Sequence, residues 1–160
     1  MIEEPGLYHW SLYMVDAKGE VARYHWSQND APASKNRPAE RFTVSVVKGP
    51  VRKVTPTMHM IFGMVKIEAY TPRPNTTHEV MKEHLRTIFE RSYRTVDENR
   101  AAGITCRTWV FAALEKLRQV GLLRLTREGA AGLEGKVKGI SQNAERLTMT
   151  GRPTSTVISI

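Results

Sequence analysis

The chain has 160 residues, 41% of them hydrophobic, which predicts a single compact domain over residues 1–160 with room for a core. No apolar run reaches the length of a membrane span, and the first residues are acidic where a secretory signal is basic, so we expect a cytoplasmic protein. One cysteine, Cys106, excludes an internal disulfide and a multi-cysteine metal site.

The charge is strongly positive, with a net value of +8 and a pI near 9.9. Such a balance suits an anionic partner, such as nucleic acid, acidic lipid or a phosphorylated cofactor. The basic residues are scattered among acidic ones and form no block, which is typical of a solvated surface. Charge therefore leaves a nucleic-acid role open without favouring it, and the composition indicates no oligomeric state.

The N-terminal segments have the pattern of a β-hairpin. Residues 8–15 (YHWSLYMV) and 20–26 (EVARYHW) are rich in aromatic and β-branched side chains. Between them, DAKG has Gly19 near its end, which predicts a turn. The polar segment 27–41 contains two prolines and predicts an exposed loop.

The hydrophobic period changes near the middle of the chain. Residues 41–47 (RFTVSVV) and 58–70 (MHMIFGMVKIEAY) predict further strands, so the first half is expected to be mostly sheet. Residues 75–94 instead predict a helix, because Thr76 and Glu79 match a capping box. Its apolar residues have helical spacing: Met81, Leu85, Ile88 and Phe89.

A second helix is predicted over residues 104–121, after a break at 97–103 (DENRAAG), with Gly121 as a helix-ending residue. Its apolar stripe comprises Cys106, Trp109, Val110, Ala113, Leu117 and Val120. The glycine-spaced residues 127–150 are ambiguous and suggest a frayed helix. Residues 151–160 predict a tail or an edge strand.

Cys106 falls in the first turn of this second helix, where unpaired N–H groups and the helix dipole favour a thiolate. A histidine beside it completes an activated nucleophile, because a neutral imidazole accepts the thiol proton. Two candidates lie in the predicted hairpin: His9 at the head of its first strand and His25 at the end of its second. Since a hairpin returns the end of one strand to the start of the other, we expect these two histidines to lie alongside each other.

The order of the motifs resembles that of the lecithin retinol acyltransferase-like families, a circularly permuted branch of the papain-like cysteine fold. The resemblance rests on HWSLYMVD…VARYH followed by TCRTWVFAAL. These motifs are also similar to those of a fungal family of uncharacterised proteins with HWS-I/L-Y and GCRYWV patterns. The resemblance implies His9 as the base, His25 as its polar orienter and Cys106 as the nucleophile. Thr105 and Arg107 differ from the residues beside the cysteine in the characterised acyltransferases, so the substrate is not implied.

The remaining histidines suggest no metal site. His59 alternates with two methionines and is an alternative orienter, while His78 and His84 are predicted at the surface or its boundary. No pair of histidines has the spacing of zinc ligands, so we assign no metal-ligating residue. We also assign no residue to a cofactor.

Two other classes of function stay open. Residues 106–129 also fit the recognition helix and wing of a winged-helix DNA-binding domain: a helix, a glycine, the strand LLRLT and a charged turn. The basic residues of that helix do not follow one clear face, which ranks this alternative second. A papain-like fold without catalysis, acting as a binding module, is the third.

The sequence therefore predicts an α+β fold of the permuted papain-like type, with an antiparallel sheet packed against the helix that carries Cys106. The expected protein is a thiol hydrolase or acyltransferase that acts on an ester, thioester or amide in a small-molecule or acylated substrate. We expect no metal or organic cofactor. The Cys106 N–H, at a helix N-terminus, is the first expected oxyanion donor, and the sequence does not identify a second.

Overall fold

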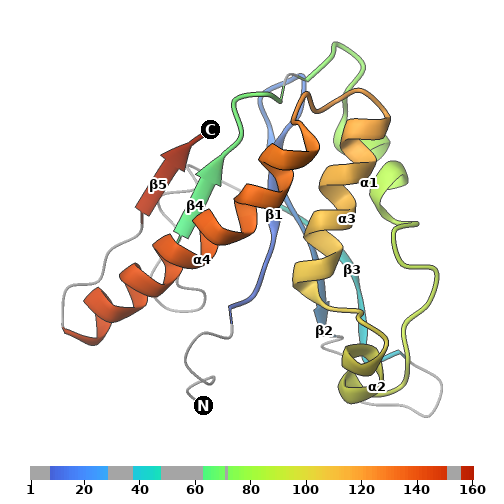
Figure 1. The fold of residues 1–160 in the computed structure, drawn as a ribbon. Coiled ribbons are helices and arrows are strands. Elements are labelled where there is room, and N and C mark those ends of the chain that lie inside the picture. Colours follow the sequence, from blue (N-terminus) through green and yellow to red (C-terminus); the bar gives the residue numbers. More distant parts are fainter. Residues whose placement is uncertain (1–7, 29–37, 48–62, 71, 151–155) are drawn as a thin grey trace. The chain divides into compact units, whose positions relative to one another are not determined.

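The computed structural model in Figure 1 describes residues 8–28, 38–47, 63–70, 72–150 and 156–160. The chain forms two compact units. We call them the sheet unit, residues 9–48 and 72–122, and the C-terminal unit, residues 1–8, 49–71 and 123–160. All three residues predicted to carry the chemistry belong to the sheet unit.

The sheet unit contains a three-stranded antiparallel sheet in the order β1-β2-β3. Its strands are β1 (Leu12–Val15), β2 (Val21–Gln28) and β3 (Glu40–Val46). β1 and β2 form the predicted hairpin, with Leu12 opposite Tyr24. Gly19 closes the turn at φ 82°, in the left-handed region that glycine enters without steric cost.

The loop between β2 and β3 is shorter than the predicted segment 27–41. β2 continues through Gln28, which pairs with Glu40 at the start of β3. Glu40 is buried, and its carboxylate accepts a 2.8 Å hydrogen bond from Arg100, so that the charge of this strand end is neutralised. Residues 29–37 of the predicted loop lie outside the described residues.

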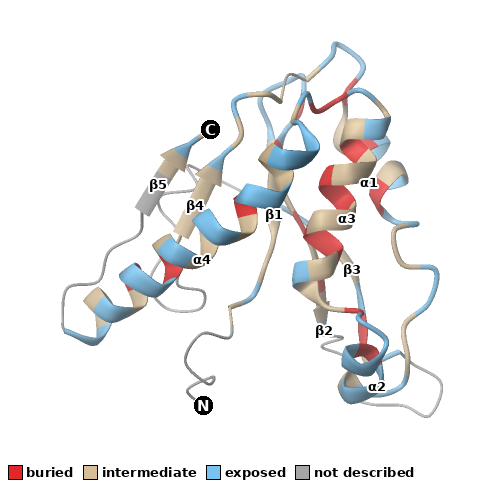
Figure 2. Ribbon diagram, viewed as in Figure 1, coloured by how far each residue is buried: buried red, intermediate tan, exposed pale blue. Residues whose placement is uncertain are grey.

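One face of the sheet packs on α3 (Cys106–Gln119). Alternation along β2 buries Ala22, Tyr24 and Trp26, while the residues between them are only partly buried. The helix residues in this core are Trp109, Val110, Ala113, Leu114 and Leu117 (Figure 2). The buried residues include most of the predicted stripe and add Leu114, whereas Cys106 and Val120 are only partly buried.

The helix predicted over residues 75–94 is much shorter in the structure. α1 (His78–Leu85) begins after Thr77, whose side chain accepts from the Val80 N–H. The predicted cap, Thr76, is wrong by one residue because its hydroxyl instead accepts a 2.9 Å hydrogen bond from the Arg73 N–H.

The predicted break at residues 97–103 is also wrong in part. α2 (Val96–Ala101) occupies most of it. A capping box explains this helix, since Thr95 accepts from the Glu98 N–H and the Glu98 carboxylate accepts from the Thr95 N–H.

The C-terminal unit combines a long helix with a small parallel sheet. β4 (Gly63–Lys66) pairs with β5 (Thr156–Ser159), and α4 (Arg127–Met149) packs on β4. Gly63 is required there, because a Cβ at this position would lie 2.5 Å from Ile140. The strand predicted over 58–70 is thus a short strand outside the antiparallel sheet, and residues 58–62 lie outside the described part of the chain.

α4 replaces the frayed helix predicted over residues 127–150 by a continuous helix of 23 residues. It also begins inside the charged turn that the winged-helix alternative assigns to the wing. Among the described helices, none has the length and apolar character needed to cross a membrane.

Candidate active site at the open end of the hairpin

Cys106 lies in the first turn of the helix, as the sequence predicted, although α3 begins at Cys106 itself and not at residue 104. The capping box fixes this position: Thr105 Oγ1 accepts from the Thr108 N–H at 3.0 Å, and Thr108 Oγ1 accepts from the Thr105 N–H at 3.0 Å. The thiol is neither fully buried nor fully exposed. It therefore lies at the positive end of the helix dipole and within reach of solvent.

The thiol contacts the segment that leads into β1. Cys106 Sγ accepts a 3.5 Å hydrogen bond from the Trp10 N–H, which belongs to the peptide bond between His9 and Trp10. The Trp10 ring also packs against Phe111 of α3, with ring centroids 5.8 Å apart. Backbone and side chain together hold the start of the hairpin against the first turns of α3.

The two predicted histidines lie side by side. His9 Nε2 and His25 Nδ1 are 2.8 Å apart, a hydrogen-bond distance, and their rings are nearly perpendicular at 86°. The strand register explains this contact. Leu12 faces Tyr24, so one step further Ser11 faces His25, and His9 lies diagonally across from His25 on the same face.

Two of the three predicted site residues contact each other directly, and the third contacts the peptide that follows His9. His9 and His25 share a hydrogen bond, and the Cys106 thiol accepts a hydrogen bond from the Trp10 N–H, in the peptide that follows His9. Among the described residues, the hydrogen bond to the thiol comes from this peptide rather than from an imidazole. His59, the alternative orienter, lies outside the described residues.

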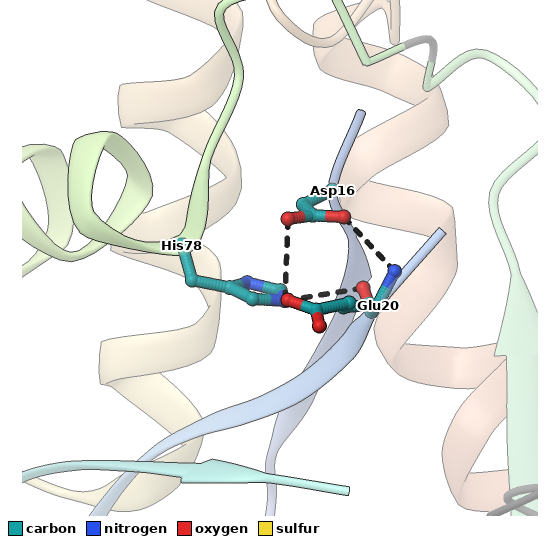
Figure 3. Close-up of side chains that lie close together, drawn as sticks. All are labelled: Asp16, Glu20 and His78. Atoms are coloured by element: carbon teal, nitrogen blue, oxygen red, sulfur yellow. Dashed lines mark hydrogen bonds and ion pairs between the residues drawn. The ribbon is translucent and has the colours of Figure 1, made fainter. Parts of the chain in front are cut away.

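A second polar cluster, of one histidine and two carboxylates, lies at the turn end of the hairpin (Figure 3). The sequence did not predict it. His78 of α1 approaches Asp16 and Glu20 of the β1–β2 turn, and the potential ligand atoms of the three side chains lie within 4.8 Å of one another. The sequence offered no sign of this cluster, because His78 is 62 positions from Asp16 and 58 from Glu20.

Both ring nitrogens of His78 have partners. Nε2 lies 3.1 Å from the Glu20 carbonyl oxygen, which can only accept, so Nε2 carries the hydrogen. Nδ1 lies 2.7 Å from the Tyr24 hydroxyl, a hydrogen-bond distance. With both nitrogens engaged in this way, we interpret His78 as a residue that ties α1 to the hairpin turn.

The carboxylate of Asp16 closes the same turn. Asp16 Oδ1 accepts from the N–H groups of Lys18 and Glu20 at 2.8 and 2.9 Å, and Oδ2 lies 4.0 Å from His78 Nε2. Burial acts to raise the pKa of this carboxyl, but the two N–H hydrogen bonds and the nearby charges of His78 and Lys18 outweigh it, so the pKa lies below its ordinary value. The cluster is therefore stabilised by an ionised Asp16.

Comparisons with models of protein families, with curated proteins and with solved structures found no match.

Proposed function

We propose that the sheet unit performs thiol-dependent acyl transfer or hydrolysis on an ester, thioester or amide. One observation carries the proposal. The Cys106 thiol accepts a hydrogen bond from the peptide N–H between His9 and Trp10, and the His9 ring is hydrogen-bonded to His25. A nucleophile, a base and an orienting group in this order are the parts of an activated cysteine.

In the proposed reaction, His9 Nδ1 takes the proton of Cys106, since Nε2 is engaged with His25. The sulfur then bonds the carbonyl carbon of the substrate, and the carbonyl π electrons move to its oxygen. When the tetrahedral intermediate collapses, the leaving group departs with the proton from His9. Water or a second nucleophile releases the acyl group from the sulfur by the same steps in reverse.

Two backbone donors support the charges that this reaction develops. The Cys106 N–H, at the start of α3, is oriented as an oxyanion donor because helix N-termini have N–H groups without helical partners. The Trp10 N–H already contacts the sulfur and stabilises the thiolate that precedes attack. A permuted papain-like fold accounts for the chain order, in which the histidine strands precede the cysteine helix.

The test is a turnover assay with aryl esters, acyl thioesters and aryl amides, combined with mass spectrometry of the intact chain. The wild type is expected to release product and to carry one acyl group on Cys106, the single cysteine. Cys106→Ala should lose both signals and retain the wild-type melting temperature within a few degrees. His84→Ala, a change on α1 away from the site, is the matched control and should stay active. Turnover that survives in Cys106→Ala would remove the proposal.

A further inference from the structure

Arg23, at the centre of β2, has a buried atom that the proposed chemistry does not use. Its Nε is shielded from solvent and has no hydrogen-bond partner among the residues that the structure describes. A buried N–H donor without a partner is unfavourable, and in native proteins such a group calls for an explanation. A guanidinium needs a partner more than a neutral donor does, because it carries a full positive charge.

The strands around Arg23 do not provide an anion. The register places Tyr13 of β1 and Ser45 of β3 directly opposite it. Its diagonal neighbours on the same face are Val15 and Thr43, and the register extended by one residue beyond β1 and β3 adds Ser11 and Val47. None of these six side chains is a carboxylate, so the sheet leaves the positive charge without an acidic cross-strand partner.

Arg23 also shares its face with the proposed base and orienter. Arg23 and His25 are separated by one residue on β2, so their side chains leave the same face, with Cα atoms about 7 Å apart. His9 joins this face through its hydrogen bond to His25. The opposite face, with Tyr24 and Trp26, is buried against the core.

We infer that Arg23 binds an oxyanion, a carboxylate or phosphate, on the substrate of the Cys106 reaction. The inference rests on the proposed function. A guanidinium forms paired N–H hydrogen bonds with the oxygens of either anion, and Nε is one donor of such a pair. The short distance along β2 requires the anion and the reacting carbonyl to lie within one small molecule. The substrate class is therefore a small acyl compound with a negative charge on its acyl chain or on its leaving group.

The kinetic test compares two anionic thioesters with their neutral methyl esters: one has a carboxylate on the acyl chain, the other a phosphate on the thiol portion. The wild type is expected to prefer one anionic member of these pairs by about 10- to 100-fold in kcat/KM. Arg23→Gln should abolish that preference and change the rates of the neutral thioesters less than twofold. Arg23→Lys should keep part of it, because the charge remains but the paired donors are lost.

Arg86→Gln is the matched control, since it removes the same charge from an exposed position at the end of α1 and should leave the preference intact. Equal preference in Arg23→Gln and the wild type would overturn the inference, as would a wild type that does not distinguish the anionic members. Arg23 variants that fail to fold would also overturn it, by giving the residue a structural role.

A binding measurement separates this inference from the proposed function. Succinate and inorganic phosphate are titrated while the imidazole NMR signals of His25 are followed. A saturable shift in the wild type that disappears in Arg23→Gln supports the anion site, even if every turnover assay is negative and the acyl chemistry fails. A shift that is the same in both proteins, or absent from both, contradicts it.

Discussion

Histidines lie at both ends of the first hairpin, His78 of α1 beside the turn and His9 with His25 at the open end, and their hydrogen bonds differ. At the turn end, His78 lies at hydrogen-bond distance from the Glu20 carbonyl and the Tyr24 hydroxyl, beside the buried Asp16 carboxylate. At the open end, His9 and His25 hydrogen-bond to each other, and the peptide after His9 contacts the thiol.

The difference lies in what each imidazole can do with a proton. A ring nitrogen that donates to a carbonyl is fixed as a donor, because the carbonyl has no proton to return. Two imidazoles that share a hydrogen bond can exchange donor and acceptor roles, since either ring can carry the proton. The hydrogen bond from His78 to the Glu20 carbonyl is therefore fixed in direction, whereas the one between His9 and His25 can reverse.

His9→Ala is the change expected to separate the two ends most strongly. Removing the proposed base should lower kcat/KM by about 10²- to 10⁴-fold, because general base catalysis typically contributes a factor of this size. The unfolding free energy should change by less than about 0.5 kcal/mol, because the His9 side chain is exposed. Steady-state kinetics and urea denaturation of the same preparation measure both quantities. A variant that loses stability and keeps activity would reverse the assignment of the two ends.

His78→Ala should show the opposite pattern. It removes the hydrogen bonds to Tyr24 and Glu20, which is expected to lower the free energy of unfolding by about 1–3 kcal/mol. The activity per folded molecule should not change. His84→Ala, on the same helix, is the control and should cost less than about 0.5 kcal/mol in urea denaturation. If the two variants are equally stable, the hydrogen bonds of His78 do not support the fold.

His25→Ala tests the orienting role at the open end. Loss of the 2.8 Å contact should free the His9 ring to rotate and lower kcat by about tenfold, with a changed pH profile. His25→Asn keeps a polar partner and should recover part of the activity. A purely structural His25 would instead lower the melting temperature and leave the pH profile of kcat as it is in the wild type.

Asp16→Asn should have the smallest effect, present at neutral pH and fading in acid. A carboxyl whose pKa is lowered by folding stabilises the fold above its ordinary pKa of about 4, and this contribution is lost as pH falls through the lowered value. The wild type should therefore lose stability between neutral pH and pH 3. The variant should be less stable at pH 7 and lose less on acidification, as measured by melting temperature at both pH values. Equal losses in both proteins would show that protonation of Asp16 does not cause the loss of stability in acid.

The open end could be predicted because its signals are local. A cysteine that opens an amphipathic stripe marks a helix N-terminus, and the β-strand pairing of a short hairpin brings His9 near His25. Neither inference required knowledge of how distant elements pack.

The turn end could not be predicted for the opposite reason. His78 reaches Asp16 and Glu20 only because α1 begins where Thr76 O accepts a 2.9 Å hydrogen bond from the Ala17 N–H, a contact between segments far apart in sequence. The sequence pattern also placed the cap of α1 at Thr76 instead of Thr77, since either threonine could cap the helix. In the structure the Thr76 hydroxyl accepts from the Arg73 N–H, and the Thr77 hydroxyl accepts from the Val80 N–H.

An activated thiol at the open end of the hairpin should be visible in the rate at which iodoacetamide alkylates Cys106 across pH. The chain has one cysteine, so the reaction reports a single site. We expect the wild type still to react rapidly at pH 6 to 7, and His9→Ala to shift the profile toward the ordinary thiol midpoint of about 8.5. Superimposable profiles in the two proteins would contradict this expectation, and would leave His9 and His25 as structural residues of the hairpin.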